Sequence, residues 1–198
     1  MFLLGHLGIG KKIASPWAKG LPLPWLFLGT ILPDLIDKPL YYSQVFITGR
    51  HGRELGWITG TRSIGHTAIL LLIVAGTAMA RRSKILAALA LGMATHLVLD
   101  SVGEQFGPMR GMVTDSSLIL ALLYPLYDFR FPILQHKNAA EHLSALMNSW
   151  VVGAELVGAT LLAWDYWKSS HKAEILQMLT LRRLRKRKLK KHVRGRIN

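Results

Sequence analysis

The sequence contains no cysteine among its 198 residues, which excludes disulfides, thiolate nucleophiles and cysteine-based zinc sites. Any metal ion must therefore be held by histidine and carboxylate side chains, with help from the backbone or water. Charge is also scarce, because Asp, Glu, Lys and Arg make up only 18% of the chain, against 51% apolar residues. One compact domain fits this length, and the composition favours a membrane protein over a soluble one.

Acidic residues are few, with 11 against 25 Lys and Arg and a net charge of +14. The excess is uneven: 12 of the basic residues lie from Lys168 onward, and ten of these lie in 182–196, where there is no acid. The high isoelectric point therefore describes a C-terminal tail and not the whole surface. The apolar opening, 1–10, has no positive charge before it and is not typical of a cleaved signal peptide.

Several apolar segments, separated by short polar or basic loops, are candidates for crossing a membrane. Each is at or below the ~20 residues that a span usually needs. Backbone groups in lipid must bond internally, and no barrel-like alternation is present, so the segments are expected to be helices. We predict an all-α fold, a multi-pass transmembrane helical bundle with four to five short apolar helices; the alternative is a buried bundle in water. The segments are 21–33, 64–80, 85–99, 112–127 and 150–167.

This pattern predicts three regions. A membrane-embedded domain is expected at 1–132, a polar helix with the last membrane helix at 133–167, and a basic cytoplasmic tail at 168–198. Within them, 41–62 is expected to be a polar connection and 135–149 a surface helix.

Ionisable side chains beside the apolar segments are few, so their placement is informative. His96 and Asp100 stand four residues apart, on one face of a predicted helix. Asp34 and Asp37 stand three residues apart in a short stretch bracketed by prolines, so the two carboxylates can point together. His66 begins the next apolar segment.

Counting membrane crossings brings these five side chains to one face. If 21–33 crosses fully, the two carboxylates that follow it emerge on the face where His66 stands. The next helix returns to the same face and delivers His96 and Asp100 there. Ionisable groups in membranes are costly and are functional by default. Two imidazoles and three carboxylates favour zinc as the cofactor, with manganese or iron as alternatives, over calcium.

Other ionisable residues are weaker candidates. The count of membrane crossings does not place His6 with the other five side chains, since a full crossing by 21–33 leaves it on the opposite face of the membrane. His6 can reach the site only if 21–33 is re-entrant, or if the first ten residues cross part of the membrane. Glu104 follows Asp100 by four residues and is a candidate base, whereas Arg62 is a candidate clamp for a phosphate or carboxylate. A solvated helix face is the better interpretation of His136, Glu141 and His142.

Five short elements lie within about 1–132, at 5–7, 32–37, 61–67, 95–100 and 124–131. Together they resemble the membrane-bound metal-dependent hydrolase family typified by the YdjM-like proteins. The resemblance implies kinship with helical zinc-dependent phospholipases and metal ligands at His6, Asp34, Asp37, His66, His96 and Asp100. In the family's His-Arg-Gly-x-Thr-His element, Thr61 stands at the first His, Ser63 at the Gly and Gly65 at the Thr.

The favoured hypothesis is a membrane-bound hydrolase that cleaves a phosphoester in a lipid or lipid-linked substrate. One or two metal ions would lower the pKa of water and polarise the phosphoryl oxygen. Asp37 or Glu104 would take the proton, and Arg62 would hold the non-reacting oxygens.

The alternative is a non-enzymatic membrane anchor or scaffold whose basic tail is its working part. Such a tail beside a span binds anionic lipid headgroups, whereas nucleic acid is disfavoured because no aromatic residues are interleaved with the charges. A proton-relay transporter is a third possibility, although the chain is small for one and shows no inverted repeat. Five crossings and positive-inside counting place tail and site in the cytoplasm; a re-entrant segment would separate them.

Overall fold

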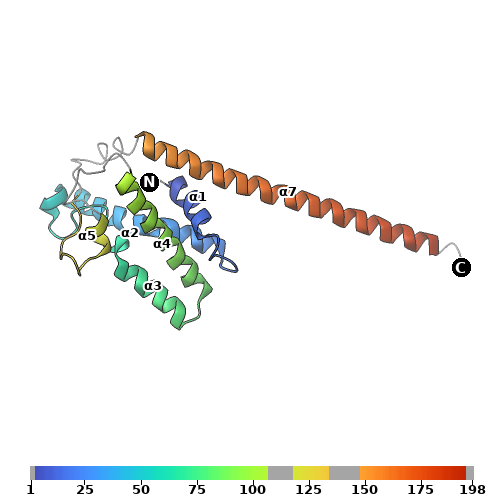
Figure 1. Cartoon of the computed structure of the whole chain (residues 1–198), viewed down its shortest axis with the longest axis horizontal. Coiled ribbons are helices and arrows are strands. Elements are labelled where there is room, and N and C mark those ends of the chain that lie inside the picture. Colours follow the sequence, from blue (N-terminus) through green and yellow to red (C-terminus); the bar gives the residue numbers. More distant parts are fainter. Residues whose placement is uncertain (1–2, 107–117, 134–147, 195–198) are drawn as a thin grey trace. The chain divides into compact units, whose positions relative to one another are not determined.

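A computed structural model describes residues 3–106, 118–133 and 148–194, with side chains at 3–104, 118–133 and 148–171. The described residues form helices and turns and contain no β-strand, which confirms the predicted all-α class (Figure 1). The helices are α1 (Leu3–Ala14), α2 (Leu23–Thr48), α3 (Ala68–Ala80), α4 (Lys84–Phe106), α5 (Leu118–Leu122) and α7 (Ser149–Arg194), with short 3₁₀ turns η1 (Gly52–Leu55) and η2 (Ile64–His66).

Residue contacts divide the chain into two units, Met1–Ala159 and Thr160–Asn198. The boundary falls inside α7, whose first eleven residues, 149–159, belong to the first unit. All the residues predicted to form the site belong to that first unit. The three predicted regions, with boundaries after 132 and 167, stay a prediction.

Helix α4 packs against α1, α2 and α3 (Figure 1). It crosses α2 in backbone contact, because a Cβ on Gly29 would meet the backbone of Leu89 and a Cβ on Gly92 would meet that of Leu26. Small residues that allow two helices to approach so closely are typical of helix packing in membranes. The crossing places the turn of α2 after Gly29 beside the turn of α4 after Gly92.

Helix α2 is longer than the sequence indicates. The sequence predicts a short span or a re-entrant piece at 21–33 and a polar connection at 41–62, but α2 continues through Pro33 and Pro39 to Thr48. A proline inside a helix removes one backbone donor, and neighbouring groups can then bond to the carbonyls of the disturbed turn. The helix ends only at Gly49, whose left-handed φ of 67° and N–H bond to Val45 form a C-cap.

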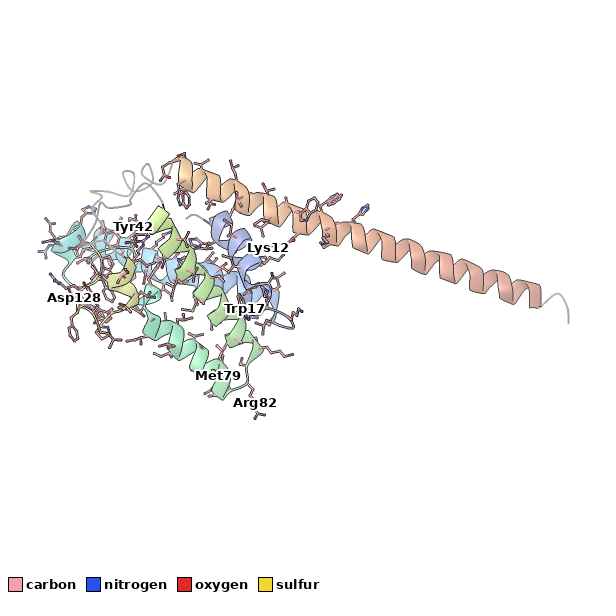
Figure 2. The ribbon with its side chains drawn as sticks, viewed as in Figure 1. Lys12, Trp17, Tyr42, Met79, Arg82 and Asp128 are labelled. Carbon is pink, nitrogen blue, oxygen red and sulfur yellow. The ribbon has the colours of Figure 1, made fainter. Side chains whose placement is uncertain are left out.

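One described helical stretch, Lys84–Glu104 in α4, is long and apolar enough to cross a membrane. Helix α3 is apolar but shorter, and Ala78 is its only buried residue. Its Leu72 is 67% exposed and its Met79 is 80% exposed. Met79 is labelled in Figure 2, near the end of α3. A helix that is apolar on every side fits lipid better than water.

The number of membrane crossings stays a prediction. Part of the segment 112–127 lies outside the described residues, and the rest contains only the five-residue helix α5. Most of the predicted surface helix at 135–149 also lies outside them, with its His136, Glu141 and His142. The segment 150–167 is helical throughout, within α7.

Candidate metal centre

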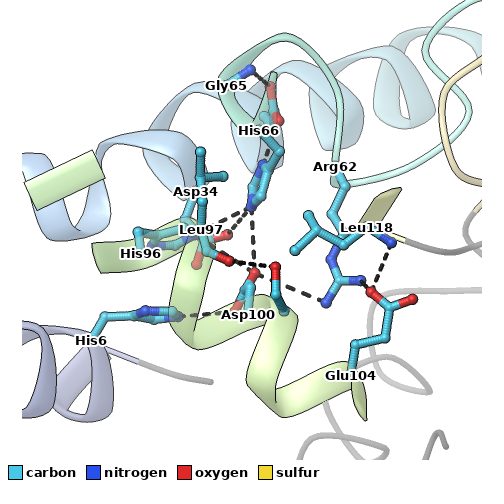
Figure 3. A network of polar contacts seen from close by, with 12 residues as sticks. His6, Asp34, Arg62, Gly65, His66, His96, Leu97, Asp100, Glu104 and Leu118 are labelled. Atoms are coloured by element: carbon cyan, nitrogen blue, oxygen red, sulfur yellow. Dashed lines mark hydrogen bonds and ion pairs between the residues drawn. The ribbon is translucent and has the colours of Figure 1, made fainter. Parts of the chain in front are cut away.

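Six ionisable side chains from four elements meet where α1, α2, η2 and α4 come together (Figure 3). Their ligand atoms form two groups, each with all atoms within 4.8 Å of one another, and His96 belongs to both. One group is Asp34, His66 and His96; the other is His6, His96 and Asp100. Asp37 contacts His66 Nδ1, on the side of the ring away from His96, and belongs to neither group.

Asp37 holds the ring of His66 in place. Its Oδ2 lies 2.7 Å from His66 Nδ1, and both residues are fully buried. The same carboxylate accepts hydrogen bonds from Ser63 N–H at 2.6 Å, Ser63 Oγ at 2.8 Å and Gly65 N–H at 2.8 Å. Gly65 allows this contact, since a Cβ there would press on Pro33 and on the carboxylate itself. Four donors surround Asp37, so the geometry favours a positioning role over the ligand role predicted for it.

His96 is held by the backbone of α2. Its Nδ1 lies 2.8 Å from the carbonyl oxygen of Thr30, which can only accept, so Nδ1 carries the proton. The same reasoning assigns the Nδ1 proton of His66, because its partner is a carboxylate.

The Nε2 atoms of His66 and His96, which are the ring nitrogens not bonded to Asp37 or Thr30, face each other at 3.2 Å. In neutral rings with protonated Nδ1 atoms, each Nε2 is an acceptor, and two acceptors at this distance need a proton or a cation beside them. Asp100 Oδ2 lies 3.5 Å from the first nitrogen and 3.7 Å from the second, and Asp34 Oδ1 lies 3.9 Å from His66 Nε2. These nitrogen and oxygen atoms are a fitting donor set for zinc, manganese or iron.

Burial disfavours the imidazolium form of His66, but hydrogen bonds and charges from Asp100 and Asp37 outweigh it and hold the pKa of His66 above its ordinary value. The same carboxylates would attract a metal cation, which would compete with the proton for Nε2 of this ring.

His6 completes the second group. The imidazole is 1% exposed, and neither ring nitrogen has a hydrogen-bond partner in the part of the chain that the structure describes. It stacks on the ring of His96 with centroids 4.0 Å apart, and its Nε2 lies 3.3 Å from Asp100 Oδ1. Buried polar atoms are nearly always bonded, so an unbonded imidazole aimed at a carboxylate is what a ligand position would leave. The count of membrane crossings could not place His6. The packing of α1 on α2 and α4 places its side chain beside His96 and Asp100.

Arg62 and Glu104 border the cluster on one side (Figure 3). Arg62 Nη1 lies 3.3 Å from Glu104 Oε2, and Nη2 lies 3.9 Å from Asp100 Oδ2. The Arg62 side chain is 25% exposed, and the Leu118 N–H donates to Glu104 Oε2 at 2.7 Å. The guanidinium thus lies between the buried carboxylates and the exterior.

Sequence reasoning missed the groups that orient these side chains. Ser63 and Gly65 act through their backbone N–H groups and Thr30 through its carbonyl, and backbone atoms leave no signal in residue type. Glu155 accepts hydrogen bonds from the start of α1. A signal for it exists, because Glu155 is the only charged residue in 149–164.

Comparison with protein families matches residues 2–178 to the family described as YdjM inner membrane protein. The match covers every residue of the cluster as well as Arg62, Glu104 and Glu155. Comparisons with curated proteins and with solved structures found no match.

Proposed function

Since the chain belongs to the YdjM inner membrane protein family, we propose that its buried His and Asp cluster is the metal centre of a membrane-bound hydrolase. The proposed substrate is a phosphoester in a lipid or lipid-linked molecule. The observation that carries the proposal is the pair of facing imidazole nitrogens, 3.2 Å apart, with carboxylate oxygens around them.

Four side chains would hold the cation directly: Asp34, His66, His96 and Asp100. His6 would be a further ligand, since its Nε2 belongs to the group with His96 and Asp100 and lies 3.3 Å from Asp100 Oδ1. A divalent metal ion there supplies Lewis acidity, which lowers the pKa of water and polarises a phosphoryl oxygen. Lys38 Nζ donates to Asp34 Oδ2 at 2.6 Å, which leaves Oδ1 on the side of His66.

Arg62 would bind the non-reacting oxygens of the phosphoryl group. It is partly exposed, it lies beside Asp100, and a guanidinium can donate two parallel hydrogen bonds to such an anion. Glu104 would accept the proton from the attacking water. It suits this role better than Asp37 because only its Oε2 is engaged in the contacts described, whereas both oxygens of Asp37 are used.

The position of the site supports a lipid substrate. His96, Asp100 and Glu104 lie in the last turns of the candidate span Lys84–Glu104, where a helix of this length approaches the headgroup region. Val98 and Val102 are 51% and 39% exposed on the same helix, and they would face the apolar part of an amphiphile. A headgroup could enter the cluster while its acyl chains stay in lipid.

Hydrolysis of defined phosphoester lipids tests the proposal. Full-length protein in detergent is stripped with a chelator, reloaded with Zn²⁺ or Mn²⁺, and given short-chain phosphatidic acid and phosphatidylglycerol in mixed micelles. We expect released phosphate or headgroup that disappears on chelation and returns with metal. Arg62→Lys should keep the metal and lose roughly 100-fold in turnover, because it loses the paired donors.

Ile85→Ala is the matched control, since it alters an exposed apolar residue at the other end of the same helix and should leave turnover unchanged. The proposal fails if the reloaded protein releases neither product, or if His66→Ala keeps the turnover of the unaltered protein.

A further inference from the structure

Glu155 is placed where an unpaired charge would be costly. It is the only charged residue in the stretch 149–164 of an apolar helix. Its two oxygens accept from the first turn of α1: Oε2 from Leu4 N–H at 2.8 Å and Oε1 from Gly5 N–H at 2.9 Å. Helix N–H groups at these positions lack partners inside the helix, and the positive end of the helix dipole stabilises a carboxylate there.

A second contact fixes the same two helices one turn further along. Gly8 of α1 and Gly158 of α7 lie so close that a Cβ on either would meet the backbone of the other helix. Glu155 and Gly158 stand three residues apart and share one helix face. The start of α1 is therefore bound to α7 both by hydrogen bonds and by backbone packing.

His6 follows Gly5 directly, so the place of its ring depends on where the start of α1 lies. The rings of His66 and His96 are each held by a hydrogen bond at Nδ1, whereas neither nitrogen of His6 has one to the described residues. The ring is oriented by its stacking on His96 and by the position of the helix, which together aim it at Asp100.

We propose that Glu155 is the positioning residue for His6, so that the beginning of α7 completes the metal centre. The proposal rests on the metal-binding part of the proposed function. It predicts that a substitution of Glu155 lowers metal affinity only by disturbing His6, and therefore by no more than the removal of His6 does. Removal of a group that orients a ligand lowers metal affinity by roughly 10–100-fold, and we expect about 10-fold here because His6 contacts the cluster through one carboxylate oxygen.

Competitive metal titration of the full-length protein in detergent tests this. Zn²⁺ affinity is measured against a chromophoric chelator, and the visible absorption of the Co²⁺ form reports the ligand set. Glu155→Ala and His6→Ala should each lower affinity about 10-fold, and the double variant should be no weaker than His6→Ala. The Co²⁺ spectrum of Glu155→Ala should match that of His6→Ala, and Glu155→Gln, which keeps one acceptor oxygen, should lie between Ala and Glu.

Val157→Ala is the control, because it alters an exposed neighbour on the same helix and should match the unaltered protein. The inference is overturned if the Glu155→Ala and His6→Ala effects multiply, or if Glu155 variants keep the original affinity and Co²⁺ spectrum. If Glu155→Ala does not fold, Glu155→Gln and its double variant with His6→Ala decide by the same criteria. Absence of metal from the unaltered protein overturns the proposed function itself, whereas loss in His66→Ala with no effect at Glu155 overturns only this inference.

Discussion

His66 and His6 flank the same central imidazole, His96, but the protein holds them in opposite ways. The ring of His66 is bonded to Asp37, which is itself held by three further donors. The ring of His6 has no hydrogen bond to residues 3–106, 118–133 or 148–194, and the packing of its helix and its stacking on His96 place it. One half of the site is thus built by local contacts around η2, and the other half by the docking of α1 against its neighbours.

This difference sets different sensitivities. A ligand with a bonded Nδ1 has a fixed tautomer and orientation, and outer partners of this kind contribute substantially to metal affinity. A ligand without such a bond depends on contacts several residues away. We therefore expect metal binding through His66 to be sensitive to substitutions of the residues that contact its ring. We expect metal binding through His6 to be sensitive to substitutions in α7.

The largest effect should follow removal of a central ring. His96→Ala takes away the only side chain shared by the two groups, so we expect metal affinity to fall by more than about 100-fold, beyond the range for an outer partner. Metal analysis of the purified variant after dialysis checks this. Retention of metal at the level of the unaltered protein would mean that the cluster is not the binding site.

Asp37→Asn should have the next largest effect. Asn keeps the shape of the side chain but replaces one acceptor oxygen with a donor, which disturbs the bonds to Ser63 and His66. We expect a roughly 10–100-fold loss in Zn²⁺ affinity with the fold retained. Chelator competition measures the affinity and circular dichroism the fold. An unchanged affinity would show that Asp37 does not orient the ring.

Acidification should weaken metal binding through His66. The pKa of this ring is held above its ordinary value, so the proton that competes with a cation for Nε2 is bound more readily as pH falls. For one displaced proton, affinity falls about 10-fold for each pH unit below that pKa. Zn²⁺ titrations across a pH series check the slope, and His66→Gln, which carries no such proton, should flatten it.

Removal of the basic tail should have the smallest effect on the site. The cluster belongs to the first unit and the residues 168–198 to the second, so a chain ending at Trp167 should bind metal and cleave lipid as before. It should lose affinity for vesicles rich in anionic lipid, at about 1 kcal/mol per basic residue near the surface. If the truncation abolishes turnover in detergent, the tail and not the cluster carries the function.

The same contrast explains what sequence could and could not predict. His96 and Asp100 at helical spacing, and His66 at the start of an apolar segment, were assigned to one place by counting crossings. That count assumes that the segment 21–33 crosses fully and ends at Pro33, whereas α2 continues past Pro33 and Pro39. His6 could not be placed, because its position comes from close packing of α1 that the count does not contain.

The groups that orient the side chains of the site were even harder to predict from the sequence. Ser63, Gly65 and Thr30 act through backbone atoms, which every residue has, so nothing in their identity indicates the role. Asp37 was predicted as a ligand or a base, whereas its contacts with Ser63, Gly65 and His66 favour a positioning role, which residue spacing does not describe. The lone Glu155 in an apolar stretch was the one readable sign that α7 contributes to the site.

X-ray absorption of the zinc-loaded, full-length protein tests the central claim most directly. The account predicts zinc bound only by nitrogen and oxygen donors at about 2.0–2.2 Å, with scattering from at least two imidazoles. That imidazole signal should disappear in the His66→Ala, His96→Ala double variant. A protein that retains no zinc, or zinc whose spectrum shows no imidazole and is unchanged in the double variant, would contradict it.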